Sequence, residues 1–124
     1  MEIKATHATF EQSKFLKERG FDEVCNTYYS IGGIFDMDYL PRPIPKDLFY
    51  APEQWQVVEW LRVKHGIWVY CEIKNDKYYC KAKKLKSNWR KVISGIINNE
   101  NIIYNTPQEA YSAAFDYILN NNLI

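Results

Sequence analysis

The stretch that decides the fold runs from Ile67 to Lys86 and reads IWVYCEIKNDKYYCKAKKLK. Apolar and polar residues alternate on both sides of Asn75-Asp76, which predicts strands over 67–74 and 77–86 joined by a two-residue turn. This register pairs Ile73 with Tyr78, Cys71 with Cys80 and Val69 with Ala82 on one face, and Glu72 with Tyr79, Tyr70 with Lys81 and Trp68 with Lys83 on the other. The first face is apolar and the second mixed, so we expect a half-buried hairpin. A shifted loop with another register is the alternative, because Asn-Asp is a weaker turn signal than Asn-Gly.

Three helices are expected around this hairpin, and capping residues mark their ends. The predicted helices are 10–19 with Thr9, Gln12 and Gly20 as its signals, 52–65 with Pro52 and Gly66, and 107–119 with Thr106, Pro107 and Glu109. The second helix is apolar on two sides, because Trp55 and Val63 lie opposite the arc of Trp60 and Leu61. Either two layers cover it or it presents aromatic rings to a partner.

A second hairpin is predicted around Gly32-Gly33, whose two glycines suit a primed turn. A two-residue loop pairs Ser30 with Phe35, Tyr28 with Met37 and Asn26 with Tyr39 on a face that we expect to be buried. The opposite face carries Thr27, Tyr29, Asp36 and Asp38 and is expected to be wetter. A proline-rich connector over 41–51 follows, in which Pro41, Pro43 and Pro45 favour an extended chain.

The remaining segment, from Asn88 to Tyr104, predicts a strand that ends at 102–104 and another over 90–97, with 98–101 as a turn. The sequence therefore predicts one compact α+β domain over residues 1–124. Its expected order is helix, hairpin, helix, an antiparallel meander of about three strands, and helix.

Composition excludes several classes of protein. Apolar residues make up 47% of the 124 and charged residues 25%, which argues against a disordered or collagen-like chain. The apolar runs are only a few residues long, so we expect no membrane span. The first 17 residues lack the apolar core of a secretory signal, and we expect a cytosolic protein.

Catalytic and metal-binding patterns are not found. The chain has no glycine-rich phosphate loop, no H-E-x-x-H and no C-x-x-C spacing, so we expect neither an enzyme nor a cofactor. Cys71 and Cys80 are expected to be thiols in a reducing cytosol. Asp36 and Asp38 could together bind a cation or act as paired carboxylates. Charges that protect a sheet edge are the commoner explanation for such a pair.

The most informative feature is an uneven distribution of charge. Residues 74–91 carry a net charge of +7, whereas the other 106 residues carry −6. Ammonium groups beside exposed rings suit phosphate attraction and base stacking, which makes this segment a candidate site for DNA or RNA. The candidate residues are Lys77, Tyr79, Lys81, Lys83, Trp68, Tyr70, Arg90 and Lys91. The alternative is a solvated edge strand that lysines guard against aggregation.

Three segments carry a resemblance: FEQSKFLK at 10–17, QWQVVEWLRVKHGIW at 54–68 and PQEAYSAAFDYIL at 107–119. They resemble small uncharacterised proteins of phages and integrated elements in gut Bacteroides-type bacteria. The resemblance covers the first helix, the second helix with the strand after it, and the last helix. It implies the cytoplasm of an infected or lysogenic bacterium and no catalytic residues.

The function expected from these observations is a small, non-catalytic accessory protein. It would bind a partner protein through exposed aromatic residues or through its acidic surface. Binding of nucleic acid by residues 74–91 is the alternative. The sequence identifies no particular partner and sets no oligomeric state, and no membrane association is expected.

Overall fold

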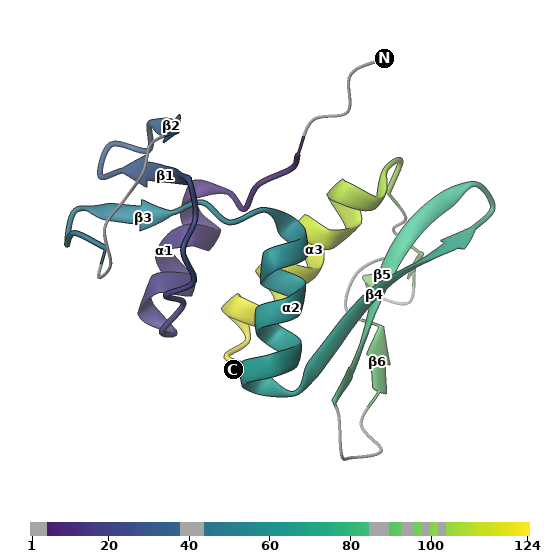
Figure 1. Ribbon diagram of the computed structural model, residues 1–124. Helices are drawn as coiled ribbons and strands as arrows, with labels where there is room; N and C mark the ends of the chain where they lie inside the picture. The colour runs from purple at the N-terminus through teal and green to yellow at the C-terminus, as the bar shows by residue number, and fades with distance from the viewer. Residues whose placement is uncertain (1–4, 38–43, 85–89, 93–95, 98–99, 102–103) are drawn as a thin grey trace. The chain divides into compact units, whose positions relative to one another are not determined.

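The computed structural model describes residues 5–37, 44–84, 90–92, 96–97, 100–101 and 104–124 (Figure 1). The helices are α1 (Phe10–Glu18), α2 (Gln54–His65) and α3 (Pro107–Asn120). The strands are β1 (Thr27–Ser30), β2 (Phe35–Met37), β3 (Leu48–Tyr50), β4 (Ile67–Lys74), β5 (Lys77–Lys84), β6 (Arg90–Val92), β7 (Ile96–Ile97) and β8 (Glu100–Asn101). The mixture of helices and antiparallel sheets that the sequence predicts is confirmed.

The chain divides into two compact units, residues 1–56 and residues 57–124, and the division falls inside α2. We call them unit 1 and unit 2 and describe each by itself. The single domain expected over residues 1–124 stays a prediction. Among the described residues, no helix has the length and apolarity to cross a bilayer.

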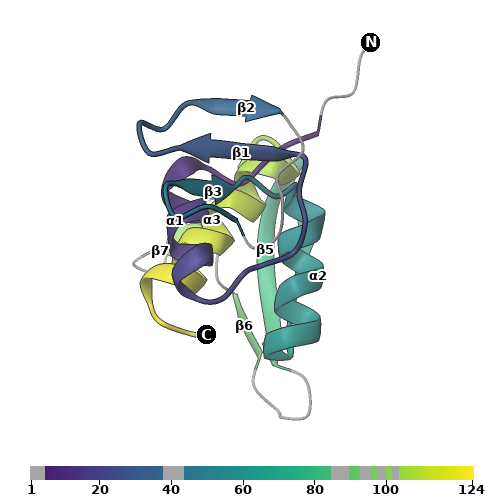
Figure 2. The same ribbon diagram turned by 60° about the vertical axis from the view of Figure 1, so that its left-hand side comes forward.

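Unit 1 is built on a sheet with the strand order β2-β1-β3 (Figure 2). Helix α1 packs against β3. Leu16 and Phe21 at the end of α1 are buried, as are Tyr50 and Ala51 at the end of β3. The buried Thr27 hydroxyl donates to the Ala51 carbonyl over 2.5 Å, which fastens the start of β1 to the chain after β3.

Both predicted ends of α1 are confirmed. The Thr9 hydroxyl accepts from the Gln12 N–H, and the Gln12 side chain accepts from the Thr9 N–H, which forms a capping box. Gly20 has a φ of +88°, and the Phe21 N–H donates to the Leu16 carbonyl over 2.9 Å. This pairing is the Schellman motif, which a glycine in the left-handed region makes possible.

The predicted register of the first hairpin is wrong by one residue. Thr27 lies opposite Met37 and Tyr29 opposite Phe35, in place of Tyr28 opposite Met37 and Ser30 opposite Phe35. The reason is a three-residue loop, 31–33, in which only Gly33 has a positive φ. The Gly33 N–H donates to the Ser30 carbonyl and the Ser30 N–H donates to the Ile34 carbonyl, as in a turn that ends in a glycine bulge.

The predicted burial of this hairpin is therefore also wrong. Thr27 is buried and Tyr29 is half-buried, whereas Phe35 and Met37 are exposed. The shift of one residue puts Phe35 and Met37 on the same face as Tyr29 and Thr27. Phe35 and Met37 are nevertheless exposed, because β2 is an outer strand of the described sheet and all three of its residues face solvent. The Asn26–Tyr39 pair predicted at the far end involves a residue outside the described part of the chain.

The connector predicted over 41–51 contains a strand that the sequence analysis missed. Leu48–Tyr50 forms β3 and pairs with β1, with Tyr29 opposite Phe49. The three prolines before it favoured an extended connector, so the sequence analysis did not predict a strand of only three residues. Pro41 and Pro43 lie outside the described residues, and the Pro45 carbonyl accepts the Leu48 N–H in a turn.

Helix α2 begins at Gln54, two residues later than predicted, and ends at His65 as predicted. The residues before it take part in the backbone of unit 1, because the Pro52 carbonyl accepts the Ala8 N–H over 2.8 Å. Its two-sided pattern is confirmed as a buried arc with Trp60 and Leu61 and an exposed side, on which the Trp55 side chain is 63% exposed.

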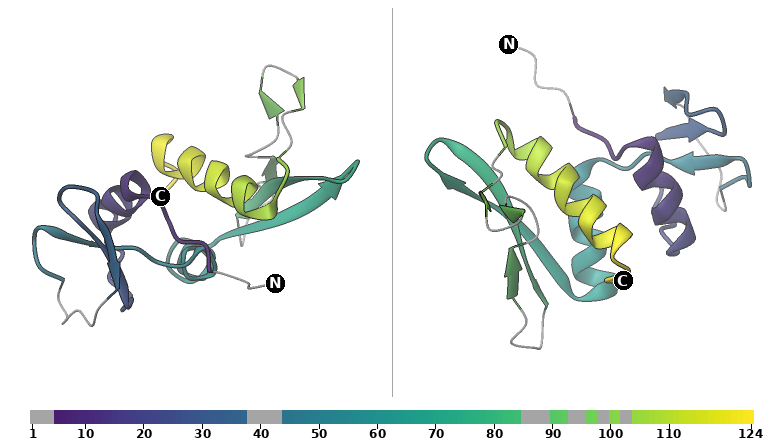
Figure 3. Two further views of the ribbon diagram at one scale, coloured as in Figure 1. Left: turned by 90° about the horizontal axis from the view of Figure 1, so that it is seen from above. Right: turned by 180° about the vertical axis from the view of Figure 1, so that it is seen from behind.

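Unit 2 contains a sheet with the order β4-β5-β6, and the predicted register of β4 and β5 is confirmed at every pair. Asn75 and Asp76 have φ of 52° and 62°, the left-handed conformation of a type I′ turn. Helix α3 packs against β4 and β5 (Figure 3). Cys80 and Ala82 of β5 and Ala110 and Ala114 of α3 are fully buried, and small residues on both elements permit close packing.

The segment before α3 differs in part from its prediction. The predicted strand over 90–97 is described as β6 and β7, with 93–95 outside the described residues. Glu100 and Asn101, predicted as turn, form β8 and pair with β7. Of the strand predicted to end at 102–104, only Tyr104 is described, and it forms an isolated antiparallel bridge to Tyr78.

We expect Thr106→Ala to lower the free energy of unfolding by about 1 kcal/mol. The Thr106 hydroxyl accepts from the Glu109 N–H over 3.2 Å, and alanine leaves that donor at the start of α3 without its acceptor. Urea unfolding measures the change. Thr106→Ser keeps the acceptor and is the matched control, so equal losses in the two variants would contradict the assignment of the cap.

Candidate functional site

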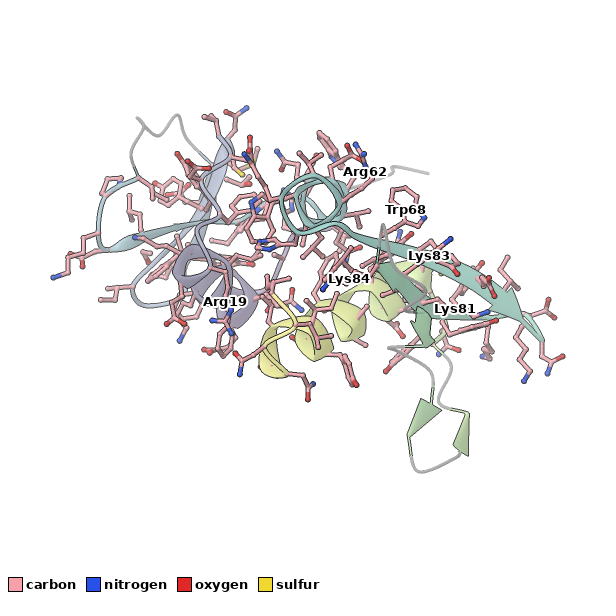
Figure 4. The ribbon with its side chains drawn as sticks, turned by 90° about the horizontal axis from the view of Figure 1, so that it is seen from below. Arg19, Arg62, Trp68, Lys81, Lys83 and Lys84 are labelled. Atoms are coloured by element: carbon pink, nitrogen blue, oxygen red, sulfur yellow. The ribbon has the colours of Figure 1, made fainter. Side chains whose placement is uncertain are left out.

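The lysine-bearing face of the β4–β5 hairpin has the side-chain order that the sequence predicts. Trp68 lies opposite Lys83, Tyr70 opposite Lys81 and Glu72 opposite Tyr79. Figure 4 shows Trp68, Lys81 and Lys83 on this hairpin. Trp68 is 38% exposed and Lys83 is exposed, whereas Tyr70, Tyr79 and Lys81 are half-buried.

An ion pair occupies the middle of this face. Lys81 Nζ lies 3.1 Å from Glu72 Oε2, and the Tyr79 hydroxyl donates to the same oxygen over 2.6 Å. The hydrogen bonds to Glu72 raise the pKa of Tyr79 and the pKa of Lys81. The ammonium also lies 5.7 Å from the centre of the Tyr79 ring. The charge of Lys81 is therefore matched by Glu72, which the sequence analysis did not count among the site residues.

The other predicted site residues lie at the two ends of the hairpin. Lys77, beside the turn, donates from Nζ to Asn105 Oδ1. At the opposite end, the backbone of Arg90 is in register with Lys83, and that of Lys91 with Ala82. The structure thus brings Trp68, Lys83 and the Arg90 backbone to one end of the sheet, and places Lys77 at the other.

The cysteines and Asp36 show no metal-binding arrangement. Cys71 and Cys80 lie opposite each other as thiols without a disulfide bond, and burial raises the pKa of Cys71. Burial also raises the pKa of Cys25, to about 12. Within the described ranges, no group of three or more His, Cys, Asp or Glu side chains is placed to hold a metal ion. Asp36 is exposed, and Asp38 lies outside those ranges.

His65 is the last residue of α2 and packs against Trp60 of the same helix. Its ring meets the Trp60 ring edge-on, with 4.6 Å between the centroids. Burial lowers the pKa of the imidazole, so it favours the neutral form. This packing explains the residue without a catalytic function.

Sequence reasoning missed a second candidate site, the pair of edges of the unit 1 sheet. The β3 edge is closed by Lys17 of α1. Lys17 Nζ donates to the carbonyls of Pro45, Lys46 and Leu48 over 3.0, 2.9 and 2.8 Å. The three donors of one ammonium are thereby all used. Lys17 Nζ also lies 4.9 Å from the centre of the Phe49 ring, and its burial lowers its pKa.

The opposite edge, β2, is apolar, and among the described residues no further strand pairs with it. Ile34 is 68% exposed, Met37 is 70% exposed and Phe35 is 42% exposed. The Phe35 ring packs with the Tyr29 ring at 5.5 Å and the His7 ring at 5.1 Å between centroids. Ile31 in the adjoining loop is exposed as well. The edge therefore presents apolar side chains to solvent beside an aromatic cluster.

The backbone groups of β2 point alternately toward β1 and away from it. The Ser30 N–H donates to the Ile34 carbonyl, so Ile34 and Asp36 are the residues whose backbone bonds to β1. The N–H groups of Phe35 and Met37 then point away from β1. The Asp36 carboxylate accepts the Met37 N–H over 2.8 Å and covers part of the open edge.

Comparison of the chain with protein-family models, with curated proteins and with solved structures gave no match. The relation to phage proteins that the sequence suggests stays a prediction. We therefore infer the function from the geometry of the two candidate sites.

We expect Lys17→Met to lower the free energy of unfolding by about 1–2 kcal/mol, because methionine keeps the stem and loses the hydrogen bonds to three carbonyls. Lys14→Met is the matched control on the same helix. Lys14 makes an ion pair with Glu11 at 2.8 Å near the surface, and its loss should cost under about 0.5 kcal/mol. Urea unfolding of both variants decides the matter, and equal costs would contradict a structural role for Lys17 at the β3 edge.

Proposed function

We propose that this chain is a non-catalytic accessory protein that binds a partner protein by pairing an extended segment of it with β2. The observation that carries the proposal is the difference between the two edges of one sheet. Lys17 binds the carbonyl of Leu48, the first residue of β3, and two carbonyls of the turn before it, while the β2 edge exposes Ile34, Phe35 and Met37 beside its outward N–H groups.

Open sheet edges are a risk that proteins usually suppress with charges, prolines or covering elements. An edge that exposes three apolar residues within four positions is therefore well explained by a partner that covers it. Strand addition suits such an edge, because main-chain hydrogen bonds supply affinity and alternate side chains supply specificity.

The proposed setting is the cytoplasm of a bacterium that carries a phage or an integrated element. It rests on the resemblance of the segments 10–17, 54–68 and 107–119. Within that setting we propose that both units belong to one domain.

The experiment is a selection of ten-residue peptides from a random library, followed by NMR titration of the selected peptides. We expect the largest shifts at the amides of Phe35 and Met37. Met37→Pro removes an outward N–H that makes no bond to β1, and an edge strand tolerates such a proline. It should abolish binding. Met37→Leu, the control, keeps the N–H and the apolar side chain and should bind like the parent.

Two results would contradict strand addition. In one, the selected peptides shift other parts of the chain and leave β2 unchanged. In the other, Met37→Pro folds as the parent does and binds the peptides equally well.

A second candidate function is nucleic-acid binding at the Trp68 end of the β4–β5 hairpin. The observation in its favour is that Trp68 and Lys83 are exposed cross-strand neighbours, with the Arg90 backbone in register beside Lys83. An exposed indole can stack on a base while the ammonium attracts phosphate. Because Glu72 already pairs with Lys81 in the middle of this face, the candidate nucleic-acid site is limited to the Trp68 end.

For this second function, gel shifts with mixed-sequence DNA and RNA at several salt concentrations provide the test. Lys83→Gln should lower the magnitude of the salt slope by about one, and Lys81→Gln should change it much less, because Glu72 already neutralises Lys81. No binding at low salt, or equal effects of the two variants, would reject this function.

A further inference from the structure

We infer that the partner segment that fits β2 carries a lysine or arginine opposite Asp36, between two apolar residues. This inference rests on the proposed function, since it names the chemistry of the segment that the open edge accepts. It follows from the two faces of β2, from the contacts of the Asp36 carboxylate and from the register available to a second copy of the chain.

The first step concerns the face that holds Phe35 and Met37. These residues alternate with Asp36, and in the ladder they lie opposite Tyr29 and Thr27 of β1. The Phe35 ring contacts the rings of Tyr29 and His7, so this face continues an aromatic cluster. The partner residues opposite Phe35 and Met37 meet apolar side chains, and burial favours apolar residues at both positions.

The second step concerns the face that holds Asp36. Its neighbour in the β1 ladder is Tyr28, which supplies no cation. Its carboxylate accepts the Met37 N–H, which is the group that a partner carbonyl must reach. Pairing with a partner strand therefore moves the carboxylate away from that N–H and brings it beside the added strand.

A carboxylate moved in this way needs a new partner, because covering an unpaired charge is costly. A lysine or arginine opposite it supplies one as a cross-strand ion pair, whereas a glutamate there repels it. Asp36 thus covers the Met37 N–H in the free protein and favours added segments of positive charge.

A second copy of this chain is not the partner that the β2 edge favours. Outward-pointing residues must face outward-pointing residues in an antiparallel pair, so full overlap of two β2 strands places Phe35 opposite Met37. That register also places Asp36 directly opposite Asp36. Like charges in that position are destabilising, and the edge consequently favours a different, basic segment.

The experiment compares three acetylated and amidated peptides, Ser-Thr-Val-Xaa-Val-Thr-Ser, in which Xaa is Lys, Gln or Glu. The dissociation constant is measured by NMR from the shift of the Phe35 amide. We expect the Lys peptide to bind about 3- to 10-fold more tightly than the Glu peptide, with Gln between them. Added salt should reduce the ratio.

Asp36→Lys reverses the charge at an exposed position, and it should reverse the order of the peptides so that Glu binds most tightly. Asp36→Asn is the neutral control and should bind all three peptides equally. Circular dichroism and the NMR spectrum of each variant confirm that it is folded.

The outcomes separate the inference from the proposed function. Equal binding of all three peptides, with shifts at β2 that Met37→Pro abolishes, would overturn the inference and leave the function standing. Shifts that avoid β2 for every peptide, or no binding at all, would overturn both. A dimer seen by sedimentation in the parent and lost in Met37→Pro would identify a second copy as the occupant and overturn the inference.

Discussion

The proposed function depends on a difference between the two edges of the three-stranded sheet of unit 1. Lys17 covers part of the β3 edge, and within the described part of the chain it makes no such contact with the β2 edge. Lys17 binds three carbonyls with one ammonium group, that of Leu48 at the start of β3 and those of Pro45 and Lys46 in the turn before it, and its position on α1 ties the helix to that edge. The capping box and the Schellman motif fix both ends of α1, so the local sequence 9–21 controls where the ammonium lies. The β2 edge has no comparable cover among the described residues, apart from the carboxylate of Asp36. This asymmetry is the observation that supports the binding function proposed for β2.

The parts of the fold that could be predicted are those whose signals are local. The Asn75-Asp76 turn favours a register in which one face of the hairpin is entirely apolar, and every predicted pair of β4 and β5 is confirmed. The capping signals at Thr9 and Thr106 are confirmed for the same reason, since each involves residues three positions apart. The errors arise where the local pattern allows two answers. Gly32-Gly33 suits a loop of two residues or of three, and one residue of difference exchanges the faces of the strand.

Of the two candidate sites, one could be predicted from the sequence and the other could not. The basic face of the hairpin could be predicted, because charge and register are both readable from the sequence. The same register places Glu72 near Lys81, so this ion pair could also have been predicted from the sequence. The β2 edge could not be predicted, because a strand is known to be an edge only when the strand order is known. That order depends on β3, three residues that a run of prolines conceals.

Amide hydrogen exchange of the free, monomeric chain tests the central claim most directly, because it reports on each edge residue separately. We expect the Phe35 N–H, which points away from β1, to exchange at close to the rate of an unfolded chain. The amides of Ser30 and Asp36, which bond across the β1–β2 ladder, should exchange orders of magnitude more slowly. Protection of Phe35 as strong as that of Asp36 would mean that another part of the chain covers β2, and would contradict the account.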